Sequence, residues 1–305
     1  MEVLSRDQWE ARAASHRARL APYVDPHLAR REAGMKHPVH DFLFGYYSQR
    51  PAQLMRWHPG AGVGLSDAPS YSSLKGYAGS PASVTADHVA SQRVLVETLL
   101  RLLRATAARP AHLGCFGMHE WAMVYRAGSV GGTRHPQPLR LGAAATDTVV
   151  ESHRIACSHF DAFRFFTPDA VPLNALSPAA DDRPEFEQPG CLHGGMDLYK
   201  HAFRLTPMIC SDLVADAFEL AWDIRVLDMR AAPYDMTGVR LDPTGEEWTP
   251  VRVETPEGKR VYADLQRGFA ERGQVIRHRL IAECDRLLTY RGTPKSASPA
   301  DATLG

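Results

Sequence analysis

The sequence predicts a mainly α fold, with a single helical domain over residues 1–291 and little β structure. Apolar residues recur at three- and four-residue steps in several segments, which indicates amphipathic helices. No internal repeat is visible, and 305 residues are enough for one large domain. The segment after Arg291, GTPKSASPADATLG, is small and polar, which predicts a disordered tail over residues 292–305.

The N-terminal half is expected to alternate helices with loops rich in proline and glycine. Residues 5–21 predict a charged amphipathic helix, followed by a loop at Pro22 and Pro26 and a short helix ending near Gly34. Residues 37–60 carry aromatic side chains at helical intervals. Residues 61–83 predict a loop, and one interpretation is that this loop acts as a lid. Helices are then expected over 89–103 and from Gly117 through Arg126.

The C-terminal half contains the longest periodic segments. Residues 146–163 and 211–229 predict helices, and apolar residues from 261 to 287 predict one long helix or two, broken near Gly268 or Gly273. Loops are expected at 128–138 and, because of its prolines, at 167–190. Short strands are expected at 138–142 and 251–258.

Composition limits the class of protein and its location. Because 35 basic residues balance 35 acidic residues, a surface that contacts nucleic acid all over is disfavoured, although one basic groove is not excluded. No apolar stretch approaches the roughly 18–20 residues that span a bilayer, and the N-terminus lacks a signal-peptide pattern. Five cysteines without a CxxC pair predict reduced thiols. We therefore expect a cytoplasmic protein with no membrane partner.

Two polar stripes are the first candidates for a functional site. His153, Cys157 and Asp161 follow one another at four-residue steps, as do His193, Asp197 and His201. Residues four apart share a face of a helix, so facing stripes could build a metal or acid–base site between two helices. Surface ion pairs would show the same spacing, and Gly194-Gly195 would weaken a helix interior. With His193 before the helix, the glycines would instead present free backbone N–H groups to an anion.

Other polar residues stand beside aromatic rings. Glu120 lies between His119 and Trp121, and its burial would raise its pKa and make it a general acid. Segments 56–60 and 226–235 place arginines and rings at helix ends, where loops contact ligands. We therefore expect a planar or anionic substrate to contact these segments through Arg56, Trp57, His58, Arg230 and Tyr234, unless the aromatic residues belong to the core.

Known nucleotide and hydrolase motifs are absent from the sequence. It contains no GxGxxG, GxxxxGK[ST] or GxSxG, and His119-Glu120 lacks the second histidine of HExxH. Cysteine and histidine recur as CxH at Cys157 and Cys191, with Cys115 near His119, but these spacings match no standard zinc site. A metal site of histidines and carboxylates stays an alternative.

Several blocks of the sequence resemble a bacterial family. They are HPVHDFLFGYYSQRPAQLMRWHPG, LGCFGMHEWAMVYR, SHFDAFRFFTP, QPGCLHGGMDLYK and RVLDMRAAPYD. The family is commonly labelled 3-methyladenine DNA glycosylase, and the resemblance covers about residues 5–290. It implies an enzyme that hydrolyses the N-glycosidic bond of an alkylated purine in DNA and requires no cofactor.

The chemistry of that reaction suggests roles for particular residues. A flipped base needs an aromatic pocket, and the sugar needs a carboxylate to stabilise positive charge or to activate water. Asp161, or Asp197 beside Tyr199, could supply the carboxylate, while His159 or His193 could protonate the base or orient water. Phosphate contacts are expected from Arg56, Arg126, Arg164 and Arg230.

Two further hypotheses remain open. A metal-dependent enzyme could act on a small molecule through iron, manganese or zinc held by His153, His159, His193 and nearby carboxylates. A non-catalytic helical binding protein could instead line a ligand pocket with the polar stripes. We favour an enzyme, because many titratable groups beside aromatic rings are costly to keep without a use.

Overall fold

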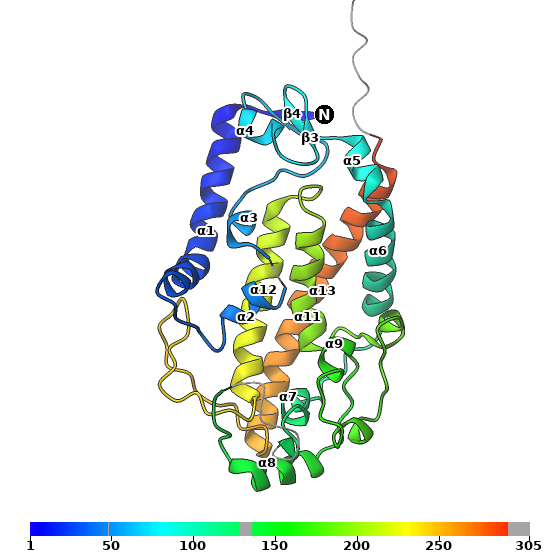
Figure 1. Cartoon of the computed structure of the whole chain (residues 1–305). Coiled ribbons are helices and arrows are strands. Elements are labelled where there is room, and N and C mark those ends of the chain that lie inside the picture. The colour runs from blue at the N-terminus through cyan, green and yellow to red at the C-terminus, as the bar shows by residue number, and fades with distance from the viewer. Residues whose placement is uncertain (48, 128–135, 292–305) are drawn as a thin grey trace, which may run out of the picture.

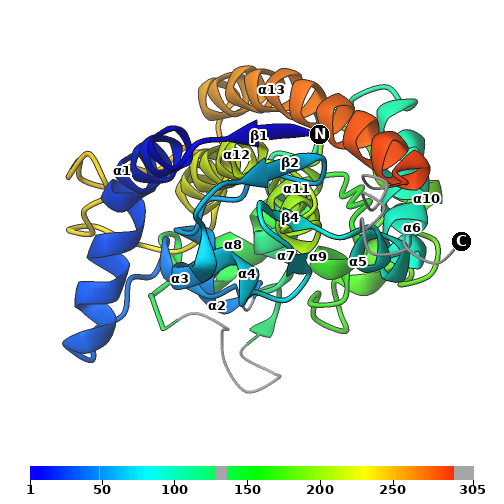
Figure 2. The same cartoon turned by 90° about the horizontal axis from the view of Figure 1, so that it is seen from above.

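Three long helices form the centre of the molecule, whose computed structural model describes residues 1–47, 49–127 and 136–291. Helices α11 (Leu192–Arg204), α12 (Ser211–Ala231) and α13 (Pro256–Thr289) lie side by side in Figures 1 and 2. Helix α6 (Arg93–Ala107) packs on α13, and α1 (Arg6–Glu32) packs on α12. The mainly α fold with little β structure is thus confirmed, while the tail expected at 292–305 lies outside the described residues.

The close approach of α11 and α12 depends on a small residue. A Cβ atom added to Gly195 would lie 2.6 Å from Cδ1 of Ile224, so the pair packs closely because this position has no side chain. Around this contact, Met196, Phe218 and Leu220 are fully buried. Of the glycine pair that would weaken an isolated helix, Gly195 therefore serves the packing, whereas a Cβ at Gly194 would make only ordinary contacts at 3.6 Å.

Helix α1 differs from the expectation, since it continues through Pro22 and Pro26 instead of breaking into a loop. An interior proline removes a helical hydrogen bond and bends the axis, and Figure 2 shows the helix changing direction along its length. Buried side chains before, between and after the two prolines offset this cost, because Leu20 and Val24 are fully buried and His27 is also buried. Proline therefore bends this helix without ending it.

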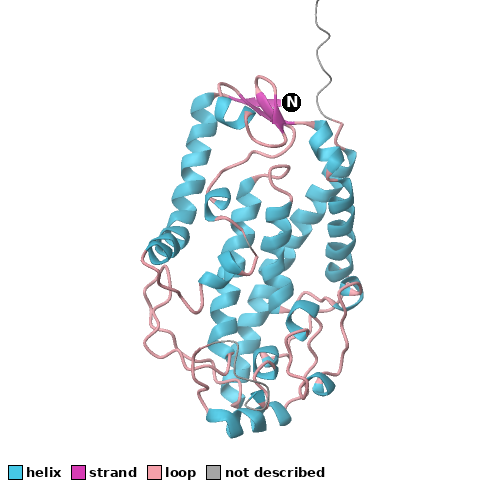
Figure 3. Cartoon of the chain, in the orientation of Figure 1, coloured by secondary structure: helices cyan, strands magenta, loops and turns pink. Residues whose placement is uncertain are grey.

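Residues 61–83, expected as a loop, form most of a small sheet. Strands β2 (Val63–Leu65), β3 (Tyr77–Ala78) and β4 (Ala82–Val84) join β1 (Glu2–Leu4) in the order β1-β2-β4-β3. Leu4 pairs with Leu65 in the parallel β1–β2 ladder, and the other two ladders are antiparallel. The sheet covers one end of the bundle, coloured magenta in Figure 3. Strands of two or three residues are too short to show a periodic pattern.

Short helices connect the long ones and carry much of the polar site. Helix α8 ends at Glu151, so the helix expected through residue 163 is broken, and 152–159 adopt irregular structure. The strand expected at 138–142 is reduced to a bridge between Leu139 and Tyr234. The strand expected at 251–258 is replaced from residue 256 by α13, which continues through Gly268 and Gly273.

The short helices are α2 (Asp41–Gly45), α3 (Pro51–Leu54), α4 (Pro69–Ser72), α5 (Ala86–Ser91), α7 (Met118–Ala122), α8 (Gly142–Glu151), α9 (Phe160–Phe163), a 3-10 turn (Val171–Leu173) and α10 (Arg183–Phe186).

Across residues 1–47, 49–127 and 136–291, no helix combines the length and the apolar character needed to cross a membrane.

Candidate functional site

A cavity of about 520 Å³ opens where α2, α7, α9, α11 and α12 meet. This volume is in the range typical of small-molecule sites. Its walls combine aromatic rings, two carboxylates, a histidine and an arginine. The lining residues are Phe42, Tyr46, Glu120, Met123, Asp161, Phe165, His193 and Arg225.

Aromatic rings from α2 provide a flat wall. Phe42 and Tyr46 are four residues apart, and their rings stack with centroids 4.7 Å apart and planes 10° from parallel. The Arg225 guanidinium carbon lies 4.2 Å from the centre of the Phe42 ring. This wall can stack against a planar ligand.

A second hollow, of about 460 Å³, adjoins the cavity and is more basic. Tyr46 and Asp161 line both spaces. The second hollow adds Arg164, Lys200 and Arg204, so cationic groups gather beside the aromatic cavity. Asp161 partly neutralises them, because its Oδ2 lies 3.4 Å from Lys200 Nζ and its Oδ1 lies 3.2 Å from Arg164 Nε.

Behind one side of the cavity, α7 and α12 hold a buried ion-pair network. His119 Nε2 lies 2.9 Å from Asp228 Oδ1, and Arg225 Nη1 lies 2.8 Å from Asp228 Oδ2. Arg225 Nη1 also lies 3.6 Å from Oε1 of Glu120, so Glu120 is buried beside a countercharge. Burial disfavours a charged His119, but the Asp228 carboxylate outweighs it and raises the pKa of His119.

A second network lies on the other side of His193. His159 Nε2 lies 3.4 Å from Asp197 Oδ2 and 3.5 Å from Glu187 Oε1. Arg183 forms ion pairs with the same two oxygens. Tyr47 donates to the other Asp197 oxygen at 3.1 Å. Burial alone would raise the pKa of Asp197, but His159 and then Lys200 hold it well below its ordinary value.

His193 connects the two networks and faces the cavity. Its ring centroid lies 4.5 Å from that of His119 and 5.3 Å from that of His159. Burial, and then the neighbouring His119, lower the pKa of His193 well below its ordinary value. His193 is therefore neutral at pH 7, and a neutral imidazole can accept a proton from water.

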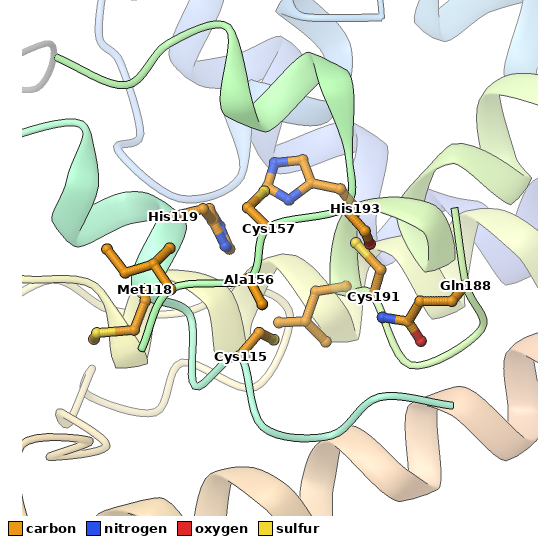
Figure 4. A pocket seen from close by; sticks show the side chains of 11 residues that line it. Cys115, Met118, His119, Ala156, Cys157, Gln188, Cys191 and His193 are labelled. Atoms are coloured by element: carbon orange, nitrogen blue, oxygen red, sulfur yellow. The ribbon is translucent and has the colours of Figure 1, made fainter. Parts of the chain in front are cut away.

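A much smaller cavity of about 20 Å³ lies beside His193 and is lined by three cysteines (Figure 4). Burial raises the pKa of Cys157 to about 12, and burial also raises the pKa of Cys191 well above its ordinary value. Cys115 completes the set. Among the described residues, the clusters of side chains compact enough to hold a metal ion consist of histidine and acidic residues, and none of them contains a cysteine. Cys157 is buried, and Cys115 and Cys191 are half-buried, so these thiols pack as small side chains.

The two sequence stripes have different outcomes. The helical stripe at 153–161 is wrong, because His153 and Cys157 precede α9 in irregular backbone and only Asp161 lies on that helix. The stripe of His193, Asp197 and His201 lies on α11 as expected, with His193 within its first turn. Asp161 and Asp197 nevertheless meet, since Lys200 Nζ lies within 3.5 Å of both carboxylates.

Most of the expected substrate contacts lie elsewhere. Trp57, Tyr199 and Tyr234 are fully buried in the hydrophobic core, where side-chain packing accounts for them. Arg126 pairs with Glu151, and Arg230 donates to the carbonyl oxygen of Thr249, in both cases away from the cavity lining. Arg56 and His58 line a separate hollow, while Arg164 belongs to the basic hollow beside the cavity.

Other residues of the site were missed by the sequence analysis. Arg225 and Phe42 lie inside the blocks that resemble the glycosylase family, which was the available signal. Arg183 and Glu187 are four residues apart on and after α10, but the prolines around them indicated only a connecting loop. Their roles depend on tertiary contacts with His159 and Asp197, which spacing does not show.

Comparisons with models of protein families, with curated proteins and with solved structures find no match to this chain. The chemistry of the cavity is therefore the basis for assigning a function.

Proposed function

We propose that the protein hydrolyses the N-glycosidic bond of an alkylated purine in DNA. The observation that carries the proposal is an aromatic-walled cavity, holding carboxylates and a neutral histidine, beside a basic hollow. These are the groups that base removal requires: a stacking surface, a carboxylate, a proton acceptor and cations for phosphate. The resemblance of the sequence blocks to the glycosylase family supports the same reaction.

A nucleotide would occupy both hollows. The base would stack on the Phe42–Tyr46 wall, and the phosphate would lie against Arg164, Lys200 and Arg204. The sugar joins base to phosphate, so it would lie at the junction of the two spaces. Asp161 and Tyr46 line both spaces and therefore occupy this junction.

Asp161 and His193 would have different catalytic roles. The Asp161 carboxylate would stabilise the positive charge that develops on the sugar as the bond to the base breaks. His193, whose low pKa keeps it neutral, would accept a hydrogen bond from the attacking water and take its proton as the water bonds to the sugar, and the proton would then pass to solvent. The alkylated base would leave with the electron pair of the broken bond.

Asp197 is a positioning residue in this scheme. Tyr47 and Arg183 occupy its two oxygens, and it does not line the cavity. From its position outside the cavity lining, Asp197 orients His159 and Lys200. Glu120, which does line the cavity, is held by Arg225 and would contribute negative charge to the wall beside the base.

The direct test is release of free base from alkylated duplex DNA, followed by chromatography. We expect Asp161→Asn to lower the rate by about a hundred-fold or more, because electrostatic stabilisation of a developing charge is usually a large contribution. Asp169→Asn, an exposed aspartate outside the cavity lining, is the matched control and should keep full activity. Absence of base release by the unaltered protein would refute the proposal.

A metal-dependent enzyme that acts on a small molecule is the second candidate, favoured by one observation. His159, Glu187 and Asp197 place three ligand atoms within 4.8 Å of one another, and one histidine with two carboxylates suits iron, manganese or zinc. Arg183 contacts the same carboxylate oxygens and would compete with the ion. Near-stoichiometric metal in the purified, untagged protein, lost in His159→Gln, would favour this candidate over the glycosylase.

A further inference from the structure

A third hollow, of about 400 Å³, lies where the segment after α3 meets the turn between α11 and α12. Arg56, Lys75 and His88 line it, and no carboxylate occurs among the described residues of its lining. Leu74, Phe203 and Pro207 add an apolar wall. Two cations, Arg56 and Lys75, and an apolar surface therefore face one space, while burial and then Lys75 lower the pKa of His88.

Backbone hydrogen bonds fix the side of the hollow that carries Arg56 and His58. The His58 N–H donates to Ser211 Oγ at 2.8 Å, and the Ser211 N–H donates to the carbonyl oxygen of His58 at 2.9 Å. Gly60 has a φ of +91°, and a Cβ there would lie 3.0 Å from the backbone nitrogen of Cys210. The Arg56 segment is thus held against the turn that carries Thr206 and Pro207.

A close backbone approach fixes the opposite side. Gly76, with a φ of +91°, passes over the His88 ring so closely that a Cβ would lie 2.7 Å from Cδ2 of the histidine. The Thr85 N–H donates to the carbonyl oxygen of Gly76 at 2.9 Å. The chain therefore places Lys75, next to Gly76, beside His88 at the rim.

The charges in this hollow lack the countercharges found in the buried networks. Arg183 and Arg225 each contact carboxylates, whereas no ion pair within 4.0 Å joins Arg56, Lys75 or His88 to a carboxylate of the described residues. The Thr206 hydroxyl in the wall is buried and has no hydrogen-bond partner in the same residues. Converging cations without a protein anion attract an external one.

We propose that this hollow is a phosphate-binding site, separate from the catalytic cavity, which holds an anionic phosphate group at Arg56, Lys75 and His88. The organic part of the ligand packs on Phe203 and Pro207. Arginine and lysine are the usual phosphate ligands in proteins. The phosphate belongs either to a small phosphorylated compound or to a nucleic-acid strand that also reaches the basic hollow across Phe203, which lines both spaces.

Isothermal titration with pyrophosphate tests the site without any activity measurement. We expect saturable binding, weakened about ten-fold or more in the double variant Arg56→Gln, Lys75→Gln, because hydrogen bonds to charged groups are the stronger ones. Both side chains are exposed, so the variant should fold normally. Arg12→Gln, an exposed arginine of α1 outside the hollow, is the control and should bind like the unaltered protein.

A second titration, with a short single-stranded oligonucleotide, identifies the source of the phosphate. Tighter binding of the oligonucleotide, lost in the double variant, assigns the site to a nucleic-acid strand. Tighter binding of pyrophosphate or of a nucleoside diphosphate assigns it to a small phosphorylated compound. No binding of any of these ligands, or equal binding by the double variant and the control, would overturn the proposal.

Discussion

His119 and His193 show how the surroundings of a residue decide its charge. Their ring centroids lie 4.5 Å apart, and both side chains are buried, yet their pKa values move in opposite directions. His119 reaches a carboxylate, Asp228, that outweighs the cost of burial. Among the described residues the His193 ring has no ion-pair partner, so burial dominates. Two similar side chains therefore differ in proton affinity within one site.

The Asp228 pair gives a prediction for a single residue. We expect Asp228→Asn to lower the free energy of unfolding by about 3–5 kcal/mol, because it leaves Arg225 and His119 buried without their carboxylate. Asp223→Asn, on the same helix but in an exposed pair with Arg272, should cost no more than about 1 kcal/mol. Urea unfolding of both variants measures the difference, and equal losses would contradict the prediction.

The same variant should change the titration of His119. Since its folded-state pKa is raised above 6.5, His119 stabilises the fold at lower pH and loses this effect as the pH rises through that pKa. In Asp228→Asn the imidazole NMR titration should therefore shift to lower pH.

At the scale of elements, glycines show where backbone packing leaves no room for a side chain. Gly258 lies in the first turn of α13, where Thr255 caps the helix by accepting from the Gly258 N–H. A Cβ at Gly258 would lie 1.9 Å from the carbonyl oxygen of Arg252, whereas at Gly268 no described atom lies within 4 Å. One helix thus contains a glycine required by packing and another that is not.

We predict opposite effects for alanine at these two positions. Gly258→Ala should destabilise the protein by about 2–3 kcal/mol or more, because the clash involves backbone that must move. Gly268→Ala should stabilise it by about 0.5–1 kcal/mol through helix propensity alone. Thermal unfolding of the two variants measures this contrast, and a stabilised Gly258→Ala protein would show that the approach to Arg252 is wrong.

At the scale of the whole molecule, several histidines are buried in their neutral form. Burial lowers the pKa of His58 to about 4, that of His201 to about 3 and that of His40 to about 2. An unfolded chain would bind protons at these positions near pH 6.5. Between these values the unfolded state binds more protons, so stability rises with pH and is lost as the pH falls.

We therefore expect the free energy of unfolding to fall as the pH decreases from about 6.5 to about 4.5, at up to about 1.4 kcal/mol per pH unit for each such histidine. His119 does not oppose this slope, because its folded-state pKa is raised above 6.5 and its contribution to stability changes only above that pH. Urea unfolding across this range tests the slope. His201→Gln should reduce it, and an unchanged slope in that variant would exclude His201 as a source.

The sequence supported α6, α12 and α13 because apolar residues recur along each of them at helical steps, whereas α11 was considered only from the four-residue spacing of His193, Asp197 and His201. It did not predict the sheet, whose strands are too short for a pattern, or the course of α1 through Pro22, where packing overrides propensity. For the site, Asp161 was visible beside Phe160, and His193 was visible in the stripe with Asp197 and His201. Arg183 and Arg225 were missed, because their contacts with Asp197 and Glu120 join segments that are distant in sequence.

Helix α12 carries two members of the polar network, Arg225 and Asp228, and is covered by α1, α11 and α13. Of its 21 residues, 15 are buried. Its amide hydrogens should consequently exchange with deuterium only when the whole protein opens, while the short helices α2 and α9 exchange through local fluctuations. Helix α12, which carries the buried charges, should thus exchange slowly, whereas α2 and α9, which supply the aromatic wall and Asp161, should exchange faster.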